Sequence, residues 1–152
     1  MRKMLMALAL LAVATPLFAS SPFAGTWKLN AAKSKYTTGA PPTNVTIVIE
    51  EQGTNLQVTA TGANADGSPI STTYTVPTMG GTGTVESGSA FDGITVKRIS
   101  DHARENTYTK GGAQLMTRHM TVSDDGKTMK SVVSGTNAKG EKIAGVDMFD
   151  KQ

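Results

Sequence analysis

A carboxylate and a guanidinium are the strongest candidates for a binding site in this sequence. The segment "YTKGGAQ" contains two adjacent glycines, a pattern typical of a two-residue hairpin turn. Counting outward from that turn places Glu105 opposite Arg118 on neighbouring strands. Inside a protein, such a pair could orient a ligand with an anionic or hydrogen-bonding head group. The alternative is a structural cross-strand pair that fixes register and contributes little energy.

We expect the face that carries this pair to point inward, because it is the more apolar face of the hairpin. The same count places Arg104 opposite His119 on the outer face. Met116 and Met120 lie on the inner face, where they could form an adaptable lining or simply fill the core. A shift of the turn by one residue would reverse these assignments.

Four further side chains complete the candidate ligand-binding set. Arg98 shares its face with Val96, so it either projects into the interior or extends its charged group to the rim. Tyr74 and Tyr108 could donate hydrogen bonds to a ligand, or lie in the core or at the rim with their hydroxyls in water. The complete set is Arg118, Arg98, Glu105, Tyr74, Met116, Met120, Val96 and Tyr108.

Neither a catalytic nor a metal-binding motif is found in the sequence. There is no cysteine and no G-x-S-x-G nucleophile motif, and "GGTGT" (80–84) lacks the lysine of a phosphate loop. His102 and His119 have no third ligand at a spacing suited to zinc. We expect several carboxylates to lie near strand ends in solvent: Asp92, Asp101, Asp147 and Asp150. The sequence therefore predicts no catalytic residue, no metal and no cofactor.

The candidate residues must be positioned by β-strands. Turn signals such as "NADG", "KGG", "SDDG" and "NAKG" separate runs rich in Thr, Val, Ile and Tyr, which is the all-β pattern. One helical turn, capped by Asn30, is expected in "NAAKSKY" (30–36). The expected strands are 25–29, 44–51, 55–61, 69–76, 82–86, 93–100, 103–109, 114–122, 128–135 and 142–149.

The short connections predict an antiparallel up-and-down meander. A meander of eight to ten strands with one apolar face buries that face best by curling until its edges meet. We therefore expect an all-β, closed or nearly closed barrel of eight to ten strands. Two longer connections, 31–44 and 77–83, interrupt this regularity.

The first nineteen residues are typical of a secretory signal peptide. Arg2 and Lys3 precede an apolar run that ends near Ala19, in the order such signals share. The run is shorter than the roughly 20 residues of a membrane-spanning helix. We expect cleavage near Ala19, a secreted or periplasmic location, no stable membrane anchor, and a single mature domain over 20–152.

The charge and cysteine content narrow the possible partners. The formal net charge of +3 includes Arg2 and Lys3, so the expected mature chain carries only about +1. Its basic residues are scattered, which argues against nucleic-acid binding. Without cysteine, an exported domain depends on its core and its strand pairing for stability.

The segment "GTWKLN" (25–30) resembles the first-strand motif of the calycins, which comprise lipocalins and intracellular fatty-acid-binding proteins. In that family the tryptophan, here Trp27, plugs one end of a β-barrel, and the glycine, here Gly25, allows a tight bend. Residues 23–150 also resemble small exported bacterial lipocalin-like proteins of unassigned function. The matching segments are "GTWKLNAAKSKY", "ANADGSPIS", "VKRIS", "YTKGG", "SDDGKTM" and "NAKGEK".

The resemblance departs from the family near the last strand. Fatty-acid-binding proteins carry an arginine and a tyrosine there that hold the ligand's carboxylate, whereas "VDMFDK" has Asp147 and Phe149 in those places. That carboxylate grip therefore does not carry over to this chain.

The resemblance implies an exported protein that holds a small lipophilic or amphiphilic molecule inside a lipocalin-like barrel. The alternative is a structural or interaction protein of the cell envelope with a filled core and no ligand. An enzyme ranks third, because no acid–base or nucleophile set converges from the pattern. The volume and lining of the interior distinguish the first two, and the sequence leaves the oligomeric state open.

Overall fold

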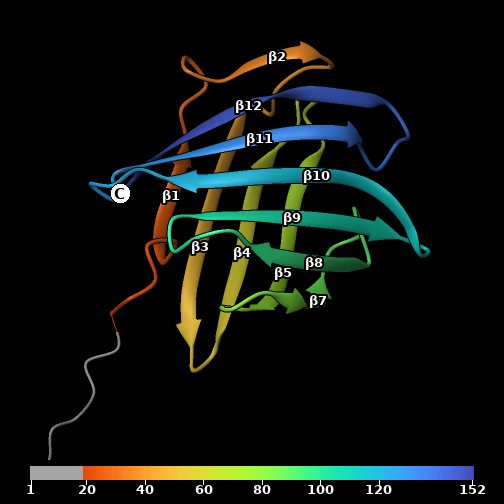
Figure 1. Cartoon of the computed structure of the whole chain (residues 1–152). Coiled ribbons are helices and arrows are strands. Elements are labelled where there is room, and N and C mark those ends of the chain that lie inside the picture. The colour runs from red at the N-terminus through yellow and green to blue at the C-terminus, as the bar shows by residue number, and fades with distance from the viewer. Residues whose placement is uncertain (1–18) are drawn as a thin grey trace, which may run out of the picture.

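The computed structural model describes residues 19–152, and the expected signal peptide lies outside that range except for Ala19. Within it the chain is built of strands and turns (Figure 1). Among these residues no helix has the length and hydropathy needed to cross a membrane. The strands are Gly25–Leu29 (β1), Lys35–Thr38 (β2), Asn44–Gln52 (β3), Asn55–Ala63 (β4), Pro69–Pro77 (β5), Gly81–Thr82 (β6), Thr84–Ser87 (β7), Gly93–Arg98 (β8), Ala103–Lys110 (β9), Ala113–Val122 (β10), Thr128–Thr136 (β11) and Lys142–Lys151 (β12).

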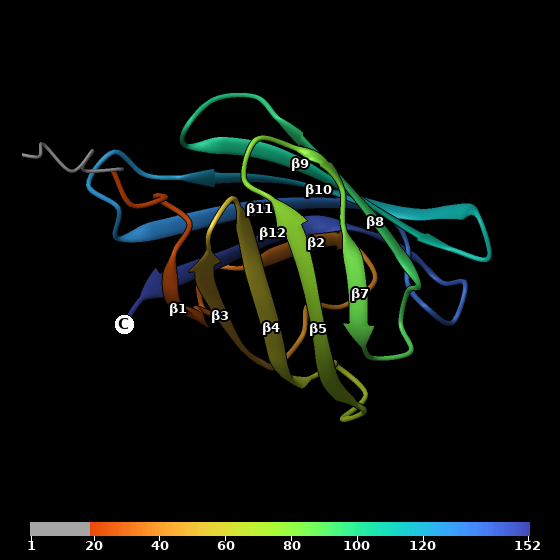
Figure 2. The same ribbon diagram turned by 90° about the horizontal axis from the view of Figure 1, so that it is seen from below.

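The strands form one antiparallel sheet that curls into a nearly closed barrel. Their order is β6-β8-β9-β10-β11-β12-β1-β3-β4-β5-β7, with β2 beside β12. Strands β8 to β12 cross steeply in front of β3 to β5 (Figure 1), and the view from below shows these two walls facing each other (Figure 2). The predicted all-β barrel is confirmed, because all strands pair antiparallel in one curled sheet and eight of the twelve pair with a neighbour in sequence.

Two pairs of elements behave as single interrupted strands. β1 and β2 pair with the same edge of β12, at 149–151 and 144–146. β6 pairs with β8 and β7 with β5, and between them the Gly83 N–H donates to the Ile94 carbonyl at 2.9 Å. The segment 81–87 thus bridges the two edges of the sheet. Counted in this way the barrel has ten strands, within the predicted range.

β2 is absent from the predicted strands, and the turn before it does not continue as a helix. The Lys33 N–H donates to Asn30 Oδ1 at 3.2 Å, as at a helix N-cap, but only one turn forms. Ser34 Oγ then accepts the Met148 N–H at 3.0 Å. This hydroxyl satisfies a β12 amide in the gap between β1 and β2, so the edge stays paired across the interruption.

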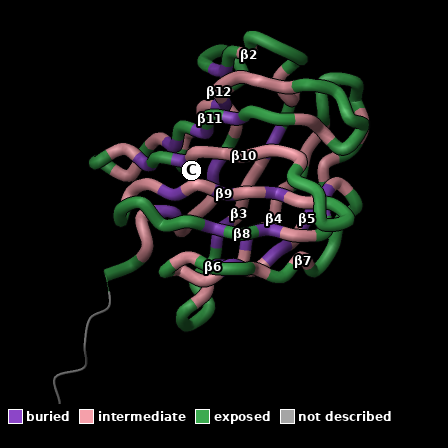
Figure 3. The backbone as a smooth tube through the Cα atoms, turned by 45° about the vertical axis from the view of Figure 1, so that its right-hand side comes forward, coloured by how far each residue is buried: buried purple, intermediate pink, exposed green. Residues whose placement is uncertain are grey.

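A buried tryptophan lies at the end of the barrel where the N-terminal segment 19–24 enters. Trp27 is 0% exposed, and its Nε1–H donates to the Phe23 carbonyl at 2.8 Å. Gly25 has φ +126, and a Cβ there would lie 2.5 Å from Lys151 Cε. The positive φ therefore favours glycine at this position, whereas the flexible end of the Lys151 side chain could move aside. Buried positions alternate along the strands, and exposed ones gather in the turns (Figure 3).

The β9–β10 hairpin contains a β-bulge that changes its predicted register. The strands pair as expected beside the two-glycine turn, but Leu115 is an extra residue on β10. Pairing resumes one residue later, so Arg118 lies opposite Asn106. The prediction that Glu105 lies opposite Arg118 is wrong for this reason, because a bulge shifts all later pairs by one.

The bulge also determines which side chains of β9 face the interior. Glu105 pairs with His119, on the face opposite the buried residues of β9, whereas the prediction placed it inside. Arg104 pairs with Met120 rather than with His119, and it is buried rather than outward-facing. β10 keeps its predicted orientation, since Met120 points inward.

Candidate functional site

A cavity of about 700 Å³ opens at the end of the barrel opposite the N-terminal segment. Four loops supply residues to its mouth, and both walls of the barrel supply residues to its sides. This volume lies within the range of small-molecule binding sites. The loops at the mouth connect β2 to β3, β4 to β5, β7 to β8, and β11 to β12.

Most of the cavity wall is apolar. Three aromatic rings pack edge to face within it: the Phe91 and Tyr108 centroids lie 4.7 Å apart, and those of Phe91 and Tyr74 lie 5.8 Å apart. Edge-to-face contacts of this kind are a preferred arrangement of aromatic rings and fix the ring orientations. The aliphatic and thioether lining includes Val45, Ile47, Val58, Ala60, Ile70, Ile143, Met116 and Met120.

A buried polar cluster interrupts this apolar wall. Arg118 Nη1 on β10 donates to Asp147 Oδ2 on β12 at 2.7 Å and to Ser131 Oγ on β11 at 3.2 Å. The Tyr36 hydroxyl on β2 donates to the same Asp147 oxygen at 3.0 Å. Asp147 is only 1% exposed. The cluster therefore gathers four strands around one carboxylate inside the barrel.

Gly145 makes room for the tyrosine of this cluster. It lies opposite Tyr36 in the β2–β12 ladder, and a Cβ at Gly145 would lie 2.3 Å from Tyr36 Cδ1. Without a side chain there, the tyrosine ring lies across β12. Its hydroxyl then reaches Asp147, which is two residues along the strand and on the same face.

The pKa shifts in the cluster favour a charged pair and a neutral phenol. Burial lowers the pKa of Arg118, but Asp147, Tyr108 and Tyr36 together raise it by more, and the net shift is upward. Burial raises the pKa of Tyr36 to about 12; Asp147 adds to this effect and Arg118 opposes it. At neutral pH the cluster is therefore an ion pair with a phenol that donates to it.

Hydrogen-bonding capacity in the cluster remains unused. Both bonds of Arg118 come from Nη1, so its Nε–H and Nη2–H groups are free of partners among residues 19–152. Asp147 Oδ1 is buried and also lacks a partner in that range. Since the Arg118 side chain is 24% exposed, the cluster offers the cavity donors from the guanidinium beside a carboxylate acceptor.

The structure divides the predicted ligand-binding residues among three places. Val96 and Arg98 line a second pocket at the N-terminal end, and Val96 is part of the packed core. Glu105 lines neither pocket. The predicted residues that do line the main cavity are Arg118, Tyr74, Tyr108, Met116 and Met120.

Three polar residues of the cluster were missed from the sequence. The expectation that Asp147 lies near a strand end in solvent is wrong. β12 continues to Lys151, so Asp147 lies in the middle of the strand and is buried. The sequence did contain a sign of this burial. Asp147 is two residues from Phe149, and alternate residues of a strand share a face. Tyr36 lay in a segment predicted to be a turn and loop, and Ser131 carries no signal that separates it from other strand serines.

An ion pair spans the mouth of the cavity. Lys139, in the β11–β12 loop, pairs with Asp66, in the β4–β5 turn. The Lys139 hydrogen bond lowers the pKa of Asp66 below its usual range, and Asp66 raises that of Lys139. The two loops are thereby joined across the opening by a solvent-exposed contact.

Within the described part of the chain, no three side chains of the metal-binding types gather in one place. The chain was compared with protein-family models, with curated proteins and with solved structures, and none of them gives a significant match.

Proposed function

We propose that this protein is an exported binding protein that holds one small amphiphilic molecule in the barrel cavity. The observation that carries the proposal is an apolar cavity of about 700 Å³ with unused hydrogen-bonding groups in its wall. A ligand chain would occupy the apolar part, where Val58, Phe91 and Met116 provide its contacts. Its polar end would lie against the Arg118–Asp147 cluster.

The charge of the cluster favours an uncharged head group. Arg118 is already neutralised by Asp147, so a second carboxylate would gain little from the guanidinium and would repel Asp147. The free groups are a donor edge on Arg118 and an acceptor, Asp147 Oδ1. A hydroxyl or an amide both donates and accepts, so either would satisfy the two sides at once.

We also propose that the chain is a calycin of the lipocalin-like type and that its first nineteen residues direct export. The nearly closed antiparallel barrel and the fully buried Trp27 in the first strand support the family assignment. The basic and apolar order of the leader supports export. Mass spectrometry of the protein secreted by its native host tests the second point, with cleavage near Ala19 as the expected result.

Ligand binding is tested with an uncharged fluorescent probe, N-phenyl-1-naphthylamine. We expect saturable binding of one probe per chain and displacement by decanol or decanamide at lower concentration than by decanoate. Ala60→Phe places a ring into the cavity wall and should abolish probe binding. The matched control is Ala113→Phe, at an exposed strand position that lines neither pocket.

Native mass spectrometry of the freshly purified protein provides an independent readout. We expect a co-purifying small molecule in the wild type and none in Ala60→Phe. Absence of saturable probe binding in a folded wild-type protein, together with no co-purifying molecule, would overturn the proposal in favour of a ligand-free structural role.

A further inference from the structure

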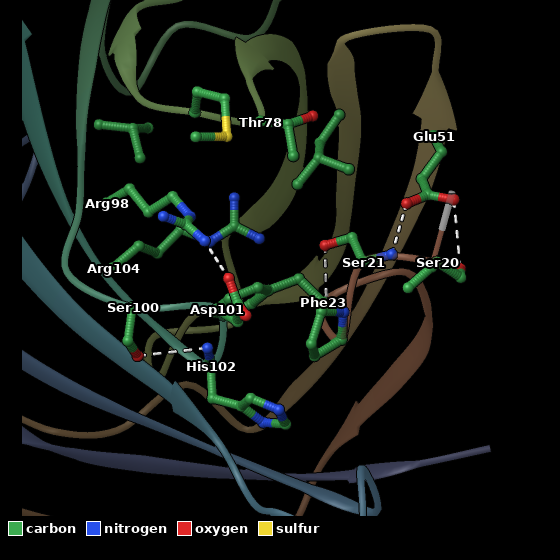
Figure 4. A pocket seen from close by; sticks show the side chains of 15 residues that line it. Ser20, Ser21, Phe23, Glu51, Thr78, Arg98, Ser100, Asp101, His102 and Arg104 are labelled. Atoms are coloured by element: carbon green, nitrogen blue, oxygen red, sulfur yellow. Dashed lines mark hydrogen bonds and ion pairs between the residues drawn. The ribbon is translucent and has the colours of Figure 1, made fainter. Parts of the chain in front are cut away.

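A second pocket, of about 410 Å³, lies at the N-terminal end of the barrel (Figure 4). It is formed by the segment 19–23, the end of β3, the β5–β6 loop and the β8–β9 turn. None of its lining residues also lines the main cavity. The two pockets are therefore separate sites at opposite ends of one barrel.

Two arginines lie directly opposite each other in this pocket. Arg98 on β8 pairs with Arg104 on β9, so both side chains lie on the same face of the sheet, and both extend into the pocket (Figure 4). Like charges in directly opposed positions destabilise a sheet unless something else neutralises them. Arg98 has such a partner, because its Nη2 bonds to Asp101.

Arg104 has no carboxylate partner among residues 19–152. It is 5% exposed, and its guanidinium carbon lies 3.6 Å from the centroid of the Phe23 ring. The Nε and Nη2 atoms are buried and make no hydrogen bond. Glu51, which also lines the pocket, instead accepts hydrogen bonds from Ser20 and Ser21.

Burying the Arg104 guanidinium without hydrogen-bond partners for Nε and Nη2 costs folding free energy. The Phe23 ring offsets part of the lost hydration, but unpaired buried N–H groups keep their desolvation penalty. Burial lowers the pKa of Arg104 to about 10, with Tyr74 and Tyr108 opposing the shift. Arg104 nevertheless stays charged at neutral pH. The fold thus keeps a permanent positive charge where a neutral side chain would cost less.

The two unpaired atoms form one edge of the guanidinium. Nε–H and Nη2–H point in nearly parallel directions, and this edge matches the two oxygens of a carboxylate or a phosphate. We propose that this pocket binds a small organic oxyanion, held at Arg104 by this two-pronged contact. The organic part of the anion would pack against Leu56, Met79 and Val96, which belong to the apolar part of the lining.

The side-chain resonances of arginine provide a direct test on the wild-type protein. The chain has four arginines, Arg2, Arg98, Arg104 and Arg118, so the Nε–H signals can be assigned one by one by substitution. We expect the Arg104 Nε–H signal to shift saturably with sodium phosphate or sodium butyrate. Sodium chloride at equal ionic strength should give no saturable shift. The anion that saturates at lower concentration identifies the source as phosphate or carboxylate.

Variants at Arg104 distinguish a binding role from a structural one. Arg104→Met should abolish saturable anion binding measured by calorimetry and should leave the melting temperature unchanged or higher, because it removes an unpaired buried charge. Arg104→Lys keeps the charge but loses the planar edge, and should weaken binding by about tenfold or more. Lys130→Met removes the same charge from the exposed face of β11, outside both pockets, and should leave anion binding unaltered.

Absence of a saturable Arg104 shift in the wild type would overturn the proposal, as would unchanged anion binding in folded Arg104→Met. A fall in the melting temperature of Arg104→Met, with no anion bound by the wild type, would assign Arg104 a structural role against Phe23. Probe binding in the main cavity is independent of all these outcomes, so the two proposed sites succeed or fail separately.

Discussion

Arg118 and Asp147 form an ion pair along the inner wall of the barrel, with Nη1 and Oδ2 2.7 Å apart, although β11 lies between β10 and β12. Ser131, on the intervening β11, is bonded to the same Arg118 nitrogen. The pair therefore links three strands on the wall of a cavity. Because either charge left alone would be partly or wholly buried, the two residues depend on each other.

Removing one member of the pair should cost more than removing both. Asp147→Asn leaves the Arg118 charge without its partner and should lower the free energy of unfolding by about 3 kcal/mol. The double variant Arg118→Met with Asp147→Asn removes both charges and should retain most of the wild-type stability. Urea unfolding of the four proteins of this cycle, with Arg118→Met alone as the fourth, measures the coupling. A double variant as unstable as Asp147→Asn would contradict the expected coupling.

The strand pattern could be predicted because turns and alternation are local properties. Val45, Ile47 and Ile49 alternate with polar residues, and β3 lies within a residue of its predicted bounds. The face of β9 could not be predicted in this way. Leu115 is as suitable for a regular strand as for a bulge, and its carbonyl is fixed by a bond from Thr136 Oγ1 on another strand. Such a contact depends on the folded sheet.

The polar cluster depends on similarly distant contacts. Tyr36 and Asp147 are brought together by the pairing of β2 with β12, and the short segment 35–38 has no strong strand pattern of its own. The prediction that Arg118 faces inward is confirmed, but its predicted partner, Glu105, is not the residue it pairs with. Its true partner, Asp147, was the residue that interrupted the family resemblance.

Gly145→Ala tests the close approach of Tyr36 to β12. The added methyl group would meet the tyrosine ring, and we expect a loss of about 1–3 kcal/mol in the free energy of unfolding. In a Tyr36→Ala background the same change should cost less than half as much. Some cost should remain, because the Lys35 carbonyl oxygen would lie 2.8 Å from the new Cβ. Urea unfolding gives both values, and equal costs in the two backgrounds would show that the ring does not limit the site.

Tyrosine ionisation should make the protein less stable at high pH. Burial raises the pKa of Tyr36 to about 12 and that of Tyr74 well above its ordinary value of 10. Between pH 10 and 12 the folded protein therefore keeps protons that the unfolded chain loses, so stability falls as pH rises. Below pH 10 both states hold these protons, and the two tyrosines contribute no slope.

Tyr36→Phe isolates one of these contributions. The wild-type absorbance at 295 nm should contain one phenolate component with a midpoint near pH 12 that is missing from Tyr36→Phe. The stability of the variant should also fall less steeply between pH 10 and 12. Arg104 has the opposite effect on stability over this range. Its pKa is lowered in the folded protein, which therefore releases this proton before the unfolded chain does, so this contribution to stability rises with pH. The comparison between wild type and Tyr36→Phe cancels that effect, and identical titration curves for the two proteins would contradict the assignment.

The Asp66–Lys139 contact should control entry to the cavity more than stability. Both side chains are solvent-exposed, and exposed pairs of this kind contribute at most about 1 kcal/mol. Lys139→Ala should therefore shift the melting temperature by no more than about 4 °C. Because the contact joins two loops across the mouth, its loss should raise the association and dissociation rates of the naphthylamine probe by about twofold or more. High salt should raise the probe rates of the wild type toward those of the variant and leave the rates of the variant unchanged.

Lys127→Ala, in the β10–β11 turn at the opposite end of the barrel, is the matched control. Stopped-flow rates that are equal in Lys139→Ala and Lys127→Ala would show that the pair does not restrict the opening.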